Sequence, residues 1–344
     1  MDFQDFLKQS AQEINQEIDR SFEKWSQEVE SVSPKLTALN KAFIQANEGG
    51  KRIRGALIKL GYELAGGSPT MEILKPAAAF EIFQTAILAH DDIVDLSPLR
   101  RGKPTVYKVL GGNHYGISQA LTLGDAGFFL AVRLIAETDF PDSRKNKALA
   151  FFAQAMLETA LGQMLDIELP YQKETRKEVD ALTIFRLKTA RYTIVGPLAL
   201  GAILGGAGKK FLEDVEKFGE ALGIAFQIQD DTLGVFGDEK TIGKSVTSDI
   251  EEGKNTLLII YALDRATKEQ KVVLDKYYGK GKIGGKELEK IKQVFVDTGA
   301  LEYSRKKAME LVTEALLVIE GMDISPEYKK LLTQMADFLV RRDK

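Results

Sequence analysis

The chain has 344 residues, of which 44% are hydrophobic and 28% are charged, and its formal net charge at pH 7 is −3. This much apolar sequence can bury a large core, whereas the lack of an overall basic charge argues against a general role in binding nucleic acid. The chain has no cysteine, which excludes disulfides and thiolate metal sites.

Apolar residues recur at helical spacing along almost the whole chain, beginning with Phe3, Phe6 and Leu7. Sustained strand-type alternation is missing. No stretch is long or biased enough to be an interdomain linker. We therefore predict an all-α protein of about ten to twelve helices, forming a single domain over residues 1–344.

The N-terminal segment lacks the basic start and apolar core of a signal peptide. The longest uncharged run, residues 192–208, is interrupted by a proline and several glycines. It is also shorter than the roughly 20 residues that a membrane span needs. We therefore expect a cytoplasmic protein without a membrane span.

The first basic cluster is Gly49-Gly50-Lys51-Arg52-Ile53-Arg54. We expect a helix to start in this segment, with Lys51 and Arg54 on one side of it. Guanidinium groups at a helix N-terminus suit phosphate recognition. Ordinary surface charge is the alternative reading.

The apolar helix predicted over 76–89 leads into Asp91, Asp92 and Asp95, which helical geometry places on one side. Two carboxylates about 6 Å apart repel by about 3 kcal/mol at an effective dielectric constant near 20. A cation between them would relieve this cost, and oxygen-only ligands favour Mg²⁺. A solvated helix end is the alternative reading for this motif alone. The basic run Arg100–Thr105 follows directly.

A second acidic pair, Asp230 and Asp231, closes another apolar helix predicted over 218–228. Two such pairs at the ends of apolar helices are unlikely to arise as two solvated faces. Facing each other, they would form a multi-metal clamp for a diphosphate. Asp238 could join this side if the helix continued that far, and Gly234 and Gly237 leave that continuation open.

In combination, these motifs resemble those of the trans-isoprenyl (polyprenyl) diphosphate synthases. The resemblance runs from about Gly49 to Thr256 and is carried by six segments: GGKRIRG, FQTAILAHDDIVD with SPLRRGKPT, GQMLDIE at 162–168, LKTA at 187–190, FQIQDD at 226–231 and GKSVTSDIEEGKNT at 243–256. It implies the all-helical isoprenoid synthase fold around a central apolar cavity, a homodimer, and two or three Mg²⁺ ions.

The resemblance also implies roles for matching positions. The metal ligands on the allylic diphosphate would be Asp91, Asp92, Asp95, Asp230 and Asp231. Further contacts to the allylic diphosphate would come from Arg100, Lys188, Lys244 and Lys254. Isopentenyl diphosphate would be held by Lys51, Arg54 and Arg101, and Thr189 and Gln227 would lie along the reacting groups.

Two positions depart from a common form of the family. Gln84 stands where many members have a histidine beside isopentenyl diphosphate, although its amide can still donate to phosphate. Gly234 replaces the last aspartate of the second motif, which leaves open whether Asp238 compensates for it.

The expected activity is head-to-tail condensation of isopentenyl diphosphate with an allylic diphosphate. The growing chain should run back along the helix of Asp91, past Ala86 and Ile87, toward Phe83 and Phe80. These two rings lie about 12 and 16 Å from Asp91 along a helix. Because an extended five-carbon unit spans about 5 Å, we expect geranylgeranyl diphosphate first and farnesyl diphosphate next. A class I terpene cyclase and a non-catalytic subunit of a synthase are the alternatives.

Overall fold

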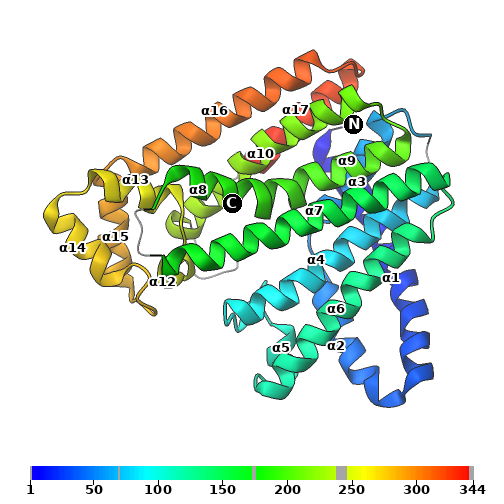
Figure 1. Ribbon diagram of the computed structural model, residues 1–344, viewed down its shortest axis with the longest axis horizontal. Coiled ribbons are helices and arrows are strands. Elements are labelled where there is room, and N and C mark those ends of the chain that lie inside the picture. Colours follow the sequence, from blue (N-terminus) through cyan, green and yellow to red (C-terminus); the bar gives the residue numbers. More distant parts are fainter. Residues whose placement is uncertain (1, 69, 173–175, 238–245, 341–344) are drawn as a thin grey trace. The chain divides into compact units, whose positions relative to one another are not determined.

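The computed structural model describes residues 2–68, 70–172, 176–237 and 246–340. Within these residues the chain is almost entirely helical, with one short hairpin, which confirms the predicted all-α fold (Figure 1). Short helices such as α5 (Val106–Val109) and α12 (Ser248–Glu252) lie between the longer ones.

The chain forms two compact units, each of which is described by itself. The first contains Met1–Ala153 and Gly196–Leu212, and the second contains Gln154–Val195 and Glu213–Lys344. The prediction of a single domain over the whole chain therefore stays a prediction.

The first unit is built from long helices and a hairpin. Its elements are α1 (Phe3–Val32), η1 (Pro34–Leu36), α2 (Thr37–Asn47), α3 (Ile53–Leu64), η2 (Met71–Ile73), α4 (Leu74–Val94), β1 (Leu99–Arg100), β2 (Lys103–Pro104), α5, α6 (His114–Ala136), the first part of α7 (Asp142–Glu168), and α9 (Gly196–Gly205).

Small residues bring the helices of this unit into backbone contact. A Cβ atom on Gly61 of α3 would lie 2.0 Å from the carbonyl oxygen of Leu198 in α9, so these two helices touch at the main chain. Likewise, a Cβ atom on Gly127 of α6 would lie 2.8 Å from Cβ of Ala86 in α4. Figure 1 shows α4 and α6 running alongside each other. This packing holds α4, the helix that carries the first aspartates, in place.

The second unit contains the rest of α7 and the helices that follow, apart from α9 and the start of α10, which belong to the first unit. Its further elements are η3 (Leu169–Tyr171), α8 (Glu178–Ile184), the π-helix η4 (Phe185–Val195), α10 (Lys209–Phe236), α12, α13 (Leu257–Arg265), α14 (Lys268–Tyr277), α15 (Gly285–Asp297), α16 (Ala300–Gly321) and α17 (Pro326–Val340). One apolar core of this unit gathers side chains of α13, such as Leu258 and Ile259, with Ile291 and Phe295 of α15.

Two helices are long and apolar enough, by length and composition alone, to cross a membrane: His114–Ala136 and Asp142–Tyr171. Core helices of proteins that never enter a membrane meet the same criterion. This finding is weak evidence for a span, and the expectation of none stays a prediction.

Candidate active site

The first aspartates lie where α4 ends. Asp91 and Asp92 belong to its last turn, and Asp95 caps the helix, donating its backbone N–H to the carbonyl oxygen of Asp91 at 2.8 Å. Asp92 is only 3% exposed. Arg100 of β1 lies against both carboxylates, with Nε 2.7 Å from Oδ1 of Asp92 and Nη2 3.5 Å from Oδ2 of Asp91.

The pKa of Asp92 reflects its burial and the charged side chains around it. Burial raises the pKa of Asp92 to about 6, Arg100 opposes that shift, and the charges of Asp91 and Asp95 add to it. Oxygen donors held together against their own repulsion suit a hard divalent cation. The donor chemistry thus fits Mg²⁺. Over the described ranges, however, no three acidic or histidine side chains are gathered closely enough to hold an ion on their own.

Arg101 follows in the turn of the hairpin. Leu99 pairs with Pro104 and Arg100 with Lys103, which leaves Arg101 and Gly102 as a two-residue turn with φ of 52° and 73°. Two successive positive φ angles are typical of a type I′ turn. The turn carries the Arg101 guanidinium to Gly50, where Nη1 would lie 3.0 Å from a Cβ atom.

The first unit concentrates arginine charge at this point. The pKa of Arg101 is lowered by burial and by three further arginines, Arg52, Arg100 and Arg54, while Glu81 opposes the shift. Neighbouring cations that lower one another's pKa repel each other, and a polyanion such as a diphosphate stabilises them.

The segment before α3 differs from the expected helix start. The helix begins only at Ile53, and Arg52 is its N-cap in the left-handed conformation, with φ of 52°. Lys51 therefore precedes the helix and does not share a helical face with Arg54, so that part of the prediction is wrong.

The physical reason for this late start is the buried position of Arg52. Its Nη1 lies 3.7 Å from Glu81 of α4, and both side chains are less than a tenth exposed. Its Nε donates to Asn15 of α1 at 2.8 Å. Glu81 also accepts the backbone N–H of Gly55 at 2.9 Å. The sequence did not indicate this anchoring role, because an arginine between two other cations reads as surface charge.

Gln84 and the two predicted phenylalanines lie on α4. Oε1 of Gln84 is buried and accepts no hydrogen bond from the residues that the structure describes. The ring centroid of Phe83 lies 4.8 Å from that of Phe128 and 5.3 Å from that of Phe152. Phe80 contacts the same Phe152 ring at 5.1 Å. The predicted floor is therefore part of a four-ring aromatic cluster.

The two smaller residues of the predicted chain path differ in their surroundings. Ala86 is fully buried. Its small size allows the close approach of α4 and α6 at Gly127. Ile87, by contrast, is partly exposed.

In the second unit, Lys188 and Lys254 meet at one carboxylate. Nζ of Lys188 lies 2.6 Å from Oδ2 of Asp166, and Nζ of Lys254 lies 3.8 Å from the same atom. Burial pushes the pKa of Asp166 up, but the two lysines outweigh it, so the pKa is lowered. The sequence motif GQMLDIE contains Asp166, yet no local signal distinguished it. Nζ of Lys254 also lies 3.0 Å from Oε2 of Glu252, so the two ammonium groups are held between two carboxylates.

A hydrogen-bonded chain runs beside this pair. Oγ1 of Thr189 lies 2.6 Å from Oε1 of Gln227, and Nε2 of Gln227 donates to Oδ1 of Asp231 at 2.6 Å. Lys188 and Thr189 both belong to the π-helix η4, a rare form that is frequent at functional sites. The hydrogen bonds thus link three of the predicted residues, Thr189, Gln227 and Asp231.

Arg191, on the same π-helix, fixes it to two neighbours. Its Nε lies 3.1 Å from Glu158 of α7, and its Nη2 contacts Glu216 and Glu220 of α10. This arginine holds the segment of Lys188 and Thr189 between those helices.

The remaining predicted residues of the second motif are only partly described. Asp230 and Asp231 lie inside α10, which continues to Phe236, so the prediction that they close the helix is wrong. Asp231 is 8% exposed. Gly234 is a buried residue of the same helix. Asp238 and Lys244 lie outside the described residues.

Comparison with known proteins agrees with this geometry. The polyprenyl synthetase family matches residues 36–297, and the chain therefore belongs to that family of prenyltransferases. The short chain isoprenyl diphosphate synthase of Methanothermobacter thermautotrophicus is 31% identical over 343 residues, covering 100% of this chain and 99% of the relative. The geranylfarnesyl diphosphate synthase of Aeropyrum pernix is 33% identical over 325 residues, covering 91% and 96%.

A solved structure has the same fold. Geranylgeranyl pyrophosphate synthase from Corynebacterium glutamicum, complexed with isoprenyl diphosphate and magnesium, superposes with a TM-score of 0.89 at 28% identity. The match covers 99% of this chain and 100% of that one. The isoprenoid synthase fold and the enzyme class expected from the sequence, a trans-prenyltransferase, are confirmed.

Proposed function

We propose that this enzyme condenses isopentenyl diphosphate with an allylic diphosphate, head to tail, to give an all-trans prenyl diphosphate. One observation supports this most strongly: each unit contains its own cationic group beside aspartates. Arg54, Arg100 and Arg101 form one, and Lys188 with Lys254, held by Asp166 and Glu252, forms the other. A reaction between two diphosphates needs two such groups, whereas a class I terpene cyclase needs one.

The allylic substrate is assigned to the aspartates and the lysine pair. The residues that would hold Mg²⁺, as two or three ions on this diphosphate, are Asp91, Asp92, Asp95, Asp230 and Asp231. When bound, Mg²⁺ supplies positive charge to the departing pyrophosphate. Arg100, Lys188, Lys244 and Lys254 add charge-assisted hydrogen bonds to its oxygens. Asp238 remains a candidate to compensate for Gly234.

Isopentenyl diphosphate is assigned to the other two arginines of the first group, together with Lys51. Lys51, Arg54 and Arg101 would bind its diphosphate, with Gln84 as a further contact. Because these groups fix the phosphate end, they hold the double bond at a set position for attack.

The bond changes follow from these assignments. The C1–O bond of the allylic substrate breaks, giving an allylic cation and pyrophosphate, whose charge the lysines stabilise. The double bond of isopentenyl diphosphate then attacks C1, and a new carbon–carbon bond forms. A proton leaves the neighbouring carbon for the released pyrophosphate. Thr189 donates to Gln227, so its hydroxyl lone pairs stay available toward positive charge.

The product length is assigned to the aromatic cluster on α4. Phe80 and Phe83, backed by Phe152, would stop the growing chain after it passes Ala86 and Ile87. We favour geranylgeranyl diphosphate as the product, with farnesyl diphosphate next.

We further propose a cytoplasmic homodimer. On α6, Leu121, Phe129 and Val132 expose apolar surface at helical spacing, and Phe129 is 75% exposed. Pairing of two copies through this face would bury it. Light scattering coupled to size exclusion would measure the mass: a dimer of the wild type and a monomer of Phe129→Glu support this interface.

The function is tested by incubating the enzyme with labelled isopentenyl diphosphate, Mg²⁺ and each allylic starter in turn. The expected result is incorporation of label, with dephosphorylated products of about four units. Release of a hydrocarbon from geranylgeranyl diphosphate alone would identify a terpene cyclase. No incorporation with any starter would identify a non-catalytic subunit.

A further inference from the structure

The turn of residues 253–255 carries Lys254 between α12 and α13. Gly253 has φ of 72°, and a Cβ atom there would lie 2.9 Å from Cα of Gly279. The backbone N–H of Lys254 donates to the carbonyl oxygen of Asp249 at 3.0 Å. The Lys254 ammonium lies 3.0 Å from Glu252 and 3.8 Å from Asp166. Its position between these carboxylates therefore depends on how this short turn is held.

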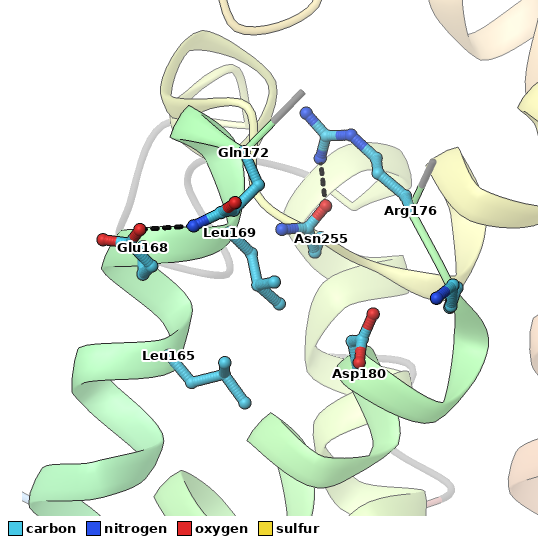
Figure 2. Close-up of a pocket in the computed structure, with 8 residues that line it drawn as sticks. Leu165, Glu168, Leu169, Gln172, Arg176, Asp180 and Asn255 are labelled. Carbon is cyan, nitrogen blue, oxygen red and sulfur yellow. Dashed lines mark hydrogen bonds between the residues drawn. The ribbon is translucent and has the colours of Figure 1, made fainter. Parts of the chain in front are cut away.

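Arg176 holds the turn from the segment before α8. Its Nη1 donates to the carbonyl oxygen of Gly253 at 2.8 Å, to that of Lys254 at 3.3 Å, and to Oδ1 of Asn255. Figure 2 shows the Arg176 side chain reaching Asn255, beside a pocket of about 230 Å³ that Leu165 also lines. One guanidinium thus contacts each residue of the turn.

Tyr278, directly after α14, contacts the same turn. Its hydroxyl donates to the carbonyl oxygen of Lys254 at 2.6 Å, and its ring centroid lies 5.5 Å from Cζ of Arg176. Tyr278 is 8% exposed, so this support is buried. Arg176 and Tyr278 therefore fix one carbonyl group together, and that carbonyl belongs to Lys254.

We infer that Arg176 is a positioning residue for the proposed condensation: with Tyr278, it sets the turn that brings the Lys254 ammonium beside Lys188 at Asp166. This inference rests on the proposed function, because it gives the two lysines a common diphosphate. A planar guanidinium can span several acceptors, which the single ammonium of a lysine cannot do. The position should therefore require arginine.

The test compares Arg176→Gln, Arg176→Lys and Tyr278→Phe with the wild type. Calorimetry measures the affinity for inorganic pyrophosphate with Mg²⁺, and kinetics measure KM for both substrates. We expect Arg176→Gln to weaken pyrophosphate binding about tenfold, the effect of losing hydrogen bonds to a charged group. KM for the allylic substrate should rise and KM for isopentenyl diphosphate should stay unchanged. Arg176→Lys should recover only part of the loss.

A matched control is Arg265→Gln. Arg265 also lies over a tyrosine, with Cζ 3.7 Å from the Tyr261 ring centroid, but it pairs with Asp264 and does not contact the turn. This variant should bind pyrophosphate as the wild type does. Thermal unfolding of all variants identifies any that fail to fold. If Arg176→Gln does not fold, Tyr278→Phe should show a smaller loss of the same kind.

A double-mutant cycle separates positioning from the other roles. If Arg176 acts through Lys254, Arg176→Gln should add little to the loss caused by Lys254→Ala. Equal losses in both backgrounds would overturn the inference, because Arg176 would then act on the ligand directly or on the whole fold. No loss in either background would overturn it too. Absence of condensation by the wild type and by Arg265→Gln would instead refute the proposed function, and this inference with it.

Discussion

Nζ of Lys188 lies 2.6 Å from Oδ2 of Asp166, and this contact joins a π-helix to α7 in the second unit. The same carboxylate is 3.8 Å from Lys254. Asp166, whose side chain is 10% exposed, thus lies beside two cations that we assign to one diphosphate, and Glu252 lies 3.0 Å from the second of them.

Replacing Asp166 by asparagine should weaken the folded state and the site together. The change keeps the shape but removes the counter-charge of Lys188 and leaves Lys254 with Glu252 alone. We expect a loss of about 1.5–3 kcal/mol at pH 7, the range for a hydrogen bond between charged groups. Chemical denaturation measures the free energy of unfolding, and the same variant should show a lower kcat.

The pH dependence of that loss has a definite sign. The pKa of Asp166 in the folded protein is below its ordinary value of 3.8. The charge therefore stabilises the fold at all pH values above about 4, and this stability is lost as pH falls through the folded pKa. The difference in the free energy of unfolding between wild type and Asp166→Asn should be constant from about pH 7 to 5 and should become smaller below about pH 4. A gap that widens on acidification would contradict the assignment.

Gly50→Ala should impair binding of isopentenyl diphosphate. Its Cβ would meet the Arg101 guanidinium at 3.0 Å and displace it. Gly49→Ala is a close control, because Gly49 also has positive φ but no atom within 4 Å of its Cβ position. Both variants share a backbone strain of about 1–2 kcal/mol. Only Gly50→Ala should raise KM for isopentenyl diphosphate, by about tenfold. Equal KM values for the two variants would show that Arg101 does not bind this substrate.

Phe83→Ala should lengthen the product by removing one ring of the aromatic cluster. The cavity should also cost about 3–5 kcal/mol of stability, so activity is best measured at low temperature. Chromatography of the dephosphorylated products gives the chain lengths. Phe295→Leu is the control for Phe83→Leu, because it makes the same change at a core residue of the second unit. An unchanged distribution for Phe83→Ala would exclude Phe83 as the floor.

The features that could be predicted from the sequence are those encoded locally. The helices that carry Asp92 and Asp231 follow from long apolar periodicity, and the acidic pairs on them are read directly from neighbouring residues in the sequence. The polar chain of Gln227 to Asp231 is likewise an i, i+4 contact on one helix.

Other features depend on contacts between distant segments. Asp166 is one of several acids on α7, and its role appears only when Lys188 and Lys254 reach it. Arg52 looked like surface charge, yet its ion pair with Glu81 of α4 places it in the left-handed conformation and delays the start of α3. No local sequence pattern indicates the contacts of Asp166 or the ion pair of Arg52.

The central proposal is that Asp91 and Asp230 act on the same metal-bound pyrophosphate. Titration of Mn²⁺ and inorganic pyrophosphate into the wild type, Asp91→Asn, Asp230→Asn and the double variant, followed by electron paramagnetic resonance, gives affinities and ion stoichiometry. We predict two or three ions per pyrophosphate in the wild type, a large loss in each single variant, and a double variant little worse than either. Fully additive losses, or a wild type that binds pyrophosphate without the metal, would contradict the account.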